Sequence, residues 1–131
     1  MGSPVELRRY EVTDLDAVLK ICAAEEWTSY TEDRSRASQV FLAPGVVAVV
    51  ASLAGDVVGF AYGQTDGAIQ AHLSLLVVNQ EHRRTGIARA IINYMFTLHG
   101  AQRMDLITDS AGAFYRALSN KEQIGFRLYA E

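Results

Sequence analysis

The run Arg83-Arg84-Thr85-Gly86-Ile87-Ala88 constrains this chain more than any other segment. It follows a largely apolar stretch over residues 73–78 and leads into a stretch with helical periodicity over residues 88–99. A strand that enters a helix through a glycine-containing turn leaves several backbone N–H groups unpaired at the positive end of the helix dipole. Such a turn binds anions, and the flanking arginines add donors that suit phosphate oxygens. The sequence therefore predicts a site for a phosphate-bearing ligand at this turn.

Length and composition predict one globular domain over residues 1–131. Half of the residues are apolar and about a fifth are charged, and the formal net charge of −3 argues against a nucleic-acid partner. The single cysteine, Cys22, lies in an apolar helical pattern and is expected to be a buried structural thiol. No apolar run reaches the roughly 18 residues of a membrane span, and no signal peptide is visible. We therefore expect a cytoplasmic protein without a membrane partner.

The first half of the chain predicts two helices and three strands. A loosely alternating strand over residues 5–10 precedes a helix over residues 13–26, for which Thr13 and Asp16 form an imperfect capping box. A shorter helix over residues 33–42 ends before Pro44-Gly45. Two β-branched runs over residues 46–53 and 57–64 flank a tight turn and predict a hairpin.

The second half predicts alternating strands and helices. They are a strand over 68–78 after the Asp66-Gly67 turn, a helix over 88–99 ending at Gly100, a strand over 104–108, a helix over 112–118 and a last strand over 125–129. The order β-α-α-β-β-β-α-β-α-β predicts a mixed α/β fold with a mostly antiparallel sheet and one parallel crossover. His82 and His99 are expected at the surface near helix ends.

With that order in place, the chain resembles the GNAT superfamily of acyl-CoA-dependent N-acetyltransferases. The family motif Arg/Gln-x-x-Gly-x-Gly/Ala is matched by Arg83, Gly86 and Ala88. A second family motif is Ala-x-x-Phe-Tyr followed by Gly-Phe. Its first part is matched by Ala111, Phe114 and Tyr115, and its second part by Gly125 and Phe126. The resemblance covers essentially the whole chain and implies a parallel strand pair that splays at the fourth and fifth strands.

Some positions depart from the family pattern. Gln80 stands where the family often has proline, Arg84 where it often has glycine, and Thr108 where asparagine is frequent. The connection between Tyr115 and Gly125 is also longer than usual.

The resemblance implies acetyl-CoA as co-substrate, with no metal. Its pyrophosphate would lie over the turn amides, so small residues at Gly86 and Ala88 would allow its close approach. The implied cofactor-binding residues are those of the turn and of the splayed strand: Leu76, Val77, Val78, Arg83, Arg84, Thr85, Gly86, Ile87 and Ala88. The amide of Val78 is the implied partner of the acetyl carbonyl. The alternative is a glycine that only permits the turn into the helix.

The general base is less clearly marked. Strand alternation predicts that Ala71, Leu73, Leu75 and Val77 share a core face, and that Gln70, His72 and Ser74 lie on the other face, which borders the acceptor cleft in the family. No carboxylate lies on this strand, and a free imidazole titrates near pH 6.5, so His72 is the candidate base. A histidine hydrogen-bonded within the sheet is the alternative. Glu26 and Asp66 are rivals, and an amine that arrives neutral would need no base.

Tyr115 matches the position of the tyrosine that protonates the coenzyme A thiolate in many relatives. A phenol with a pKa near 10 suits that role. An aromatic ring that only packs against the pantetheine is the alternative.

The acceptor is expected between the end of the first helix and the Asp66 turn. Aromatic and acidic side chains gather there, which suits a cationic amine. The candidate substrate-binding residues are Glu26, Trp27, Asp66 and Gln70, within a region that also holds Glu25, Tyr30, Glu32 and Asp33. A solvated acidic loop, with Trp27 covering the core, is the alternative.

The implied function is N-acetylation of a small amine or a protein amino group. A non-catalytic acyl-CoA-binding sensor or scaffold with the same fold is the second hypothesis. A nucleotide-binding domain is a third, but the turn lacks the Gly-Lys-Ser/Thr ending of a phosphate loop. Family members often form homodimers, although no residue here argues for one.

Overall fold

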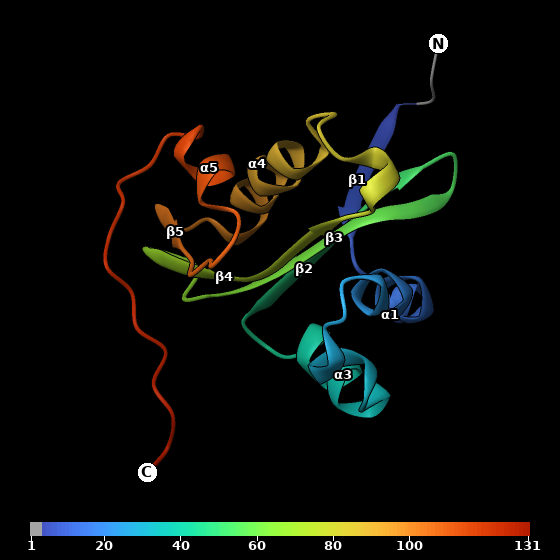
Figure 1. The fold of residues 1–131 in the computed structure, drawn as a ribbon, viewed down its shortest axis with the longest axis horizontal. Helices are drawn as coiled ribbons and strands as arrows, with labels where there is room; N and C mark the ends of the chain where they lie inside the picture. Colours follow the sequence, from blue (N-terminus) through green and yellow to red (C-terminus); the bar gives the residue numbers. More distant parts are fainter. Residues whose placement is uncertain (1–3) are drawn as a thin grey trace.

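The computed structural model describes residues 4–131, which form a five-stranded sheet with helices on both faces (Figure 1). The strands lie in sequence order, and their bounds are β1 Val5–Arg9, β2 Val46–Leu53, β3 Asp56–Thr65, β4 Gln70–Val78 and β5 Arg103–Asp105. All neighbouring pairs are antiparallel except β4–β5, which is parallel. This arrangement confirms the expected mixed α/β fold.

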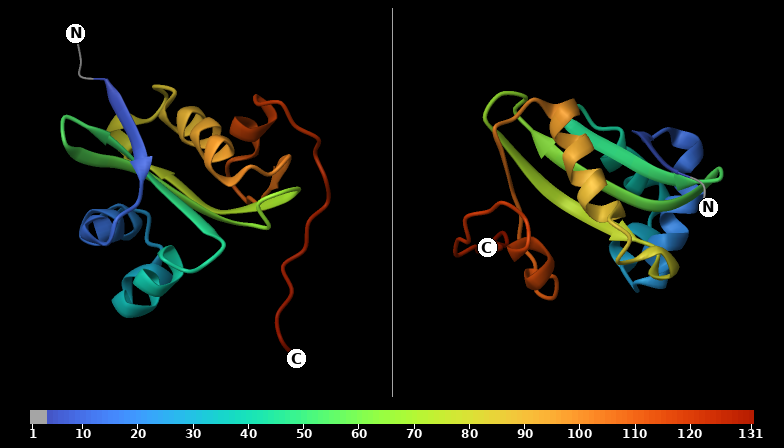
Figure 2. Two further views of the ribbon diagram at one scale, coloured as in Figure 1. Left: turned by 180° about the vertical axis from the view of Figure 1, so that it is seen from behind. Right: turned by 90° about the horizontal axis from the view of Figure 1, so that it is seen from above.

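Helices cover the two faces of the sheet unequally. The helices are α1 Leu15–Ala24, α2 Thr28–Thr31, α3 Arg34–Phe41, α4 Ile87–His99 and α5 Gly112–Arg116. Figures 1 and 2 show α1 and α3 on one face and α4 on the other, with α5 beside α4. The short helix α2 was not expected from the sequence.

Each face of the sheet buries its own apolar cluster. Phe41 of α3 and Val18 of α1 pack on Phe60 of β3 on one face. Ile91 and Met95 of α4 are fully buried on the other face. Cys22 lies in the first cluster, and burial raises the pKa of its thiol to about 11, which confirms a buried structural cysteine.

Side chains at helix starts explain the bounds of α1 and α3. The carboxylate of Asp33 accepts a hydrogen bond from the Arg36 amide at 3.0 Å and caps α3. For α1 the expected capping box of Thr13 and Asp16 is wrong. A 3₁₀ turn, Val12–Asp14, precedes the helix, and the Asp14 carboxylate accepts from the Glu11 amide at 2.8 Å. Asp14 takes this role because its carboxylate also pairs with a strand residue.

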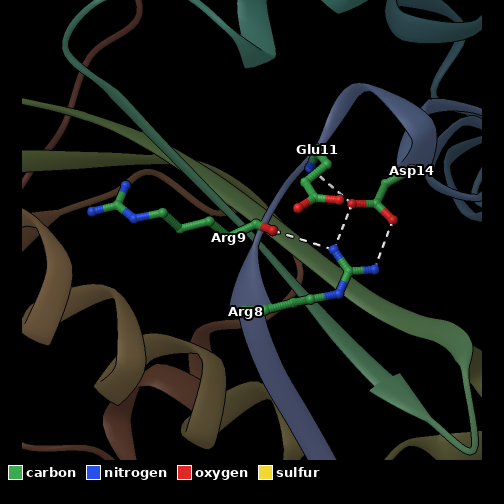
Figure 3. A network of polar contacts seen from close by, with 4 residues as sticks. All are labelled: Arg8, Arg9, Glu11 and Asp14. Carbon is green, nitrogen blue, oxygen red and sulfur yellow. Dashed lines mark hydrogen bonds and ion pairs between the residues drawn. The ribbon is translucent and has the colours of Figure 1, made fainter.

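That partner is Arg8 of β1, whose guanidinium faces the Asp14 carboxylate (Figure 3). Two parallel contacts of 2.8 Å join the groups, and the Asp14 side chain is only 8% exposed. The hydrogen bonds from Arg8 hold the pKa of Asp14 below its ordinary value. The bidentate pair therefore fixes the exit of β1 against the start of α1.

We expect Asp14→Asn to destabilise the protein by about 2 kcal/mol at pH 7, because the partly exposed guanidinium of Arg8 loses a nearly buried carboxylate that it bonds twice. A lowered carboxyl pKa adds stability that is present above the unfolded-state pKa, near 4, and is lost as the pH falls below it. Urea unfolding at pH 7 and pH 3 should therefore show a smaller difference between variant and wild type at pH 3. Asp16→Asn, which breaks an exposed pair with Arg34, is the control and should change stability little.

The expected strand over residues 125–129 is wrong. Residues 119–131 contain no helix or strand and leave α5 as an extended tail (Figure 1). Its apolar side chains alternate but are exposed, Ile124 at 86% and Leu128 at 89%. An alternating run becomes a strand only where a sheet edge pairs with it, and β5 contributes a three-residue edge that ends at Asp105.

His99, expected at the surface, is buried at the end of α4, where its Nδ1 accepts a hydrogen bond from the Ala101 amide at 2.9 Å.

Among residues 4–131, no helix is both long enough and apolar enough to cross a membrane.

Candidate active site

The turn before α4 carries a row of free backbone donors. In the part of the chain that the structure describes, the amide N–H groups of residues 84–89 have no hydrogen-bond acceptor, and the Ala90 amide is the first to bond, to Gly86 at 3.1 Å. These groups include the first-turn amides of α4, which a helix cannot satisfy internally. Because the helix dipole adds positive potential here, the turn fits an anion.

The backbone of the turn keeps the space above these amides open. Gly86 has a φ of 86°, and a Cβ added there would meet no atom within 4 Å. Arg84, with a φ of 64°, is also left-handed although it is not glycine. The turn therefore leaves an open approach to its amides, and these donors fit the diphosphate of a coenzyme A.

The end of β4 has an unpaired edge. Its parallel pairing with β5 stops at His72, opposite Asp105, so no strand within residues 4–131 pairs with residues 73–78 on that side. The Asn79 amide donates to Val58 at 2.8 Å across β3, and hydrogen-bonded positions alternate along an antiparallel pair. The N–H groups of Val78 and Leu76 therefore point to the open edge, whereas that of Val77 points to β3. The short β4–β5 ladder confirms that the two strands part.

A β-bulge in β4 overturns the predicted faces of this strand. Tyr62 of β3 is opposite Leu75, but its neighbour Gly63 is opposite Leu73, so Ser74 is an extra residue in β4. Leu73 therefore packs with α4, while Leu75 packs with α1 and α3. Strict alternation placed both on one face. The insertion of one residue shifts the pattern by one, which a period of two cannot reveal.

Gly63 is required beside this bulge because a Cβ there would lie 2.6 Å from the backbone oxygen of His72. We expect Gly63→Ala to cost about 2 kcal/mol of stability, since the two strands must move apart. Chemical denaturation measures the loss. Gly112→Ala is the control, because its Cβ would meet only the mobile guanidinium of Arg116 at 3.3 Å. Equal stability of the two variants would contradict the close approach at Gly63.

The Arg83 side chain bonds to groups within the protein, whereas the sequence predicts that it donates to phosphate oxygens at the turn. Its Nε donates to the Val78 carbonyl at 3.0 Å, and its terminal nitrogen forms an ion pair with Glu25 of α1. Two of its donor groups are therefore occupied within the protein. Arg84 and Thr85 are exposed, whereas Ile87 is buried under the turn.

Tyr115 lies in α5, beside α4. Both helices and the C-terminal tail line a groove of about 1870 Å³, to which α4 contributes Arg89, Ile92 and Asn93. The Arg89 guanidinium donates to the Ala117 carbonyl at 3.3 Å and links the two helices. Burial raises the pKa of Tyr115 above its ordinary value, so the phenol is neutral and able to donate a proton.

His72 and Gln70 lie near the start of β4, in the same groove. His72 is exposed and lies opposite Gln64 of β3 and Asp105 of β5. The Gln70 amide donates to the Asp105 carboxylate at 2.8 Å, so Gln70 joins the two parallel strands. The exposed ring of His72 is open to a ligand or water.

The expected acceptor wall is only partly assembled. Glu26, with a φ of 61°, is exposed directly after α1, and Trp27 packs against the cluster under α1 and α3. Asp66 lies at the opposite end of β4 from the turn. Its carboxylate accepts from the amides of Ala68 and Ile69 at 2.8 Å, which lowers its pKa. Asp66 is thus a weak base whose carboxylate organises the turn before β4. Because of this turn, β4 begins at Gln70 and not at residue 68 as predicted.

A hydroxyl cluster beside the bulge was not found from the sequence. The hydroxyls of Tyr30 and Tyr62 are 2.8 Å apart, and Ser74 lies beside the Tyr62 hydroxyl. Burial raises the pKa of Tyr62, and Tyr30 raises it further. Ser74 lies on the face opposite Leu73, as alternation predicts, but Tyr30 and Tyr62 come from other elements, so no pattern within β4 identifies the cluster.

The sequence profile described as an acetyltransferase (GNAT) domain matches residues 44–119, more than half of the chain. The chain belongs to the GNAT acetyltransferase family. The matched region holds β2 to β4, the free turn amides, α4 and Tyr115. This GNAT protein is therefore an acyltransferase. A comparison with curated protein sequences gives no match.

Solved structures share the fold along the whole chain. The aminoglycoside N-acetyltransferase AAC(6′)-Iy in complex with CoA superposes with a TM-score of 0.80 at 18% identity, over 100% of this chain and 97% of that one. A ribosomal-protein-alanine N-acetyltransferase from Brucella melitensis biovar Abortus 2308 has a TM-score of 0.78 at 16% identity, over 97% and 99%. The aminoglycoside acetyltransferase meta-AAC0020 with sisomicin has a TM-score of 0.74 at 18% identity, over 97% and 96%. At sequence identities of 16% and 18%, the structural similarity shows that this chain shares the GNAT fold with these proteins.

Proposed function

We propose that this GNAT protein transfers the acetyl group of acetyl-CoA to an amine. The observation that carries this proposal is the row of free amides at residues 84–89, next to the open edge of β4. The free amides suit a diphosphate, and the edge suits an extended chain that carries amide groups. A solved structure of AAC(6′)-Iy with CoA on the same fold supports the choice of ligand.

The direction of β4 assigns roles to its two free amides. With the diphosphate at the turn after β4, the pantetheine arm runs back along the edge toward the start of the strand. Leu76 and Val78 donate at points about 7 Å apart. We therefore propose that Val78 bonds the arm and Leu76, farther from the turn, bonds the thioester carbonyl. Such a fixed donor stabilises the charge that develops on that oxygen.

His72 and Tyr115 handle the two protons of the transfer. The amine nitrogen forms a bond to the acetyl carbon while the carbon–sulfur bond breaks, with acetyl-CoA supplying the activated thioester. His72 takes the amine proton through water, since it lies four residues before Leu76. Tyr115 donates a proton to the departing sulfur, because its raised pKa keeps the phenol protonated.

The acceptor is proposed to be a cationic amine or a protein amino group. Trp27 and Glu26 at the end of α1 offer an aromatic face and an exposed carboxylate. The fold neighbours include aminoglycoside and ribosomal-protein-alanine acetyltransferases, which cover both classes.

Release of free thiol from acetyl-CoA tests this function. The assay uses an aminoglycoside, a polyamine and a peptide with an N-terminal alanine as acceptors, with a no-amine control. We expect amine-dependent thiol release by wild type and a lower rate for His72→Gln. Binding of acetyl-CoA without release for any amine would instead favour a non-catalytic sensor, and the absence of binding would exclude both functions.

A further inference from the structure

Arg83 and Glu25 form a bridge between two walls of the candidate site. Glu25 is the residue that ends α1, just before Glu26 and Trp27, and its side chain is 20% exposed. Arg83 follows β4 and precedes the free turn amides. The bridge therefore joins the proposed acceptor wall to the exit of the strand that carries the proposed carbonyl donors.

The bridge also fixes the last peptide of β4. The Val78 carbonyl points to the open edge, where no strand in the described part of the chain pairs with it, and the Arg83 Nε donates to it at 3.0 Å. The N–H of the same peptide, that of Asn79, is held by Val58 on the other side at 2.8 Å. Both polar groups of this peptide are thus bonded, so the plane of the strand end is defined.

Glu25 is what orients the guanidinium for this contact. A guanidinium is a planar fork, so one nitrogen held by a carboxylate directs the remaining N–H groups. The Arg83 side chain is 45% exposed and has no second ion pair among residues 4–131, so without Glu25 only its bond to Val78 would hold it against solvent.

We propose that Glu25 and Arg83 are positioning residues. Their bridge holds the end of β4 so that its free amides point at the thioester, and it fixes the position of the acceptor wall relative to these amides. This inference rests on the proposed function. It assigns Arg83 to the strand rather than to phosphate binding, and it gives Glu25 a role distinct from binding the amine.

The test compares Glu25→Gln and Arg83→Lys with Asp16→Asn, which breaks the exposed pair between Asp16 of α1 and Arg34. Amide signals of Val78 and Asn79 are recorded by ¹⁵N NMR in the ligand-free protein, together with the Kd for acetyl-CoA and kcat. For both bridge variants we expect these signals to shift, kcat to fall about tenfold and Kd to change less than about twofold, because misplaced donors slow the reaction more than they weaken binding. Asp16→Asn should match wild type in all three.

Unchanged Val78 and Asn79 signals in Glu25→Gln would overturn the inference. A Kd weakened about tenfold in Arg83→Lys with kcat unchanged would also overturn it, since Arg83 would then be a phosphate ligand. If wild type binds no acetyl-CoA, the proposed function fails, while the NMR comparison still decides whether the bridge holds the strand end.

Discussion

Replacing Gly86 with valine is expected to weaken acetyl-CoA binding by about 100-fold or more, which corresponds to about 2.7 kcal/mol. Gly86 has a φ of 86°, which a β-branched residue adopts only with strain. A Cβ there would extend into the open space above the free amides of residues 84–89, the space that the diphosphate is proposed to enter. Both effects act against binding, and isothermal titration calorimetry measures the change in Kd.

Gly55 provides a matched control for this substitution. It has a φ of 88° in the β2–β3 turn, and a Cβ added there also meets nothing within 4 Å. Gly55→Val should therefore cost a similar amount of folding stability while leaving the Kd unchanged. If Gly86→Val binds acetyl-CoA as tightly as Gly55→Val does, the turn is not the diphosphate site.

Removing the Tyr115 hydroxyl, as in Tyr115→Phe, is expected to lower kcat about 100-fold while the Kd for acetyl-CoA stays the same. The ring still packs on the α4 side of the sheet, so binding contacts remain. Because burial raises the pKa of this phenol, wild type should keep its proton donor, and its rate, to a higher pH than the ordinary tyrosine value of about 10 allows. The pH profile of kcat for wild type should therefore fall on its alkaline side only above pH ~10.

Tyr94→Phe is the control for this variant, because Tyr94 is another half-buried tyrosine packed on the same cluster. Its hydroxyl has no role in the proposed reaction, so kcat should match wild type. Equal kcat for Tyr115→Phe and wild type would show that the ring only packs, and that water protonates the thiolate.

The turn at residues 83–88 was predictable because its signal is local. A strand, a glycine and a helix in succession determine which amides stay unpaired, whatever surrounds them. The same holds for the β2–β3 hairpin and for the helix predicted over residues 33–42, which the structure has as α3.

The faces of β4 were not predictable in the same way. The bulge at Ser74 depends on how β4 pairs with β3, and it moves Leu75 and Val77 to the face opposite Leu73, whereas strict alternation placed all three on one face. The polar cluster of Ser74 with Tyr62 and Tyr30 joins three separate elements, which the pattern of β4 alone does not encode. The expected last strand was wrong for a related reason, since alternation alone does not supply a pairing edge.

By itself the sequence determined the GNAT family, the order of the elements from β2 to α5 and the free amides around Gly86, because glycine conformation and helix ends are set by neighbouring residues. Only the tertiary structure decided that Arg83 bonds Val78 and Glu25, that Asp66 is committed to its own turn, and that Leu76 and Val78 share the open edge. Those facts depend on strand pairing and on contacts between residues distant in the chain, which no local pattern encodes.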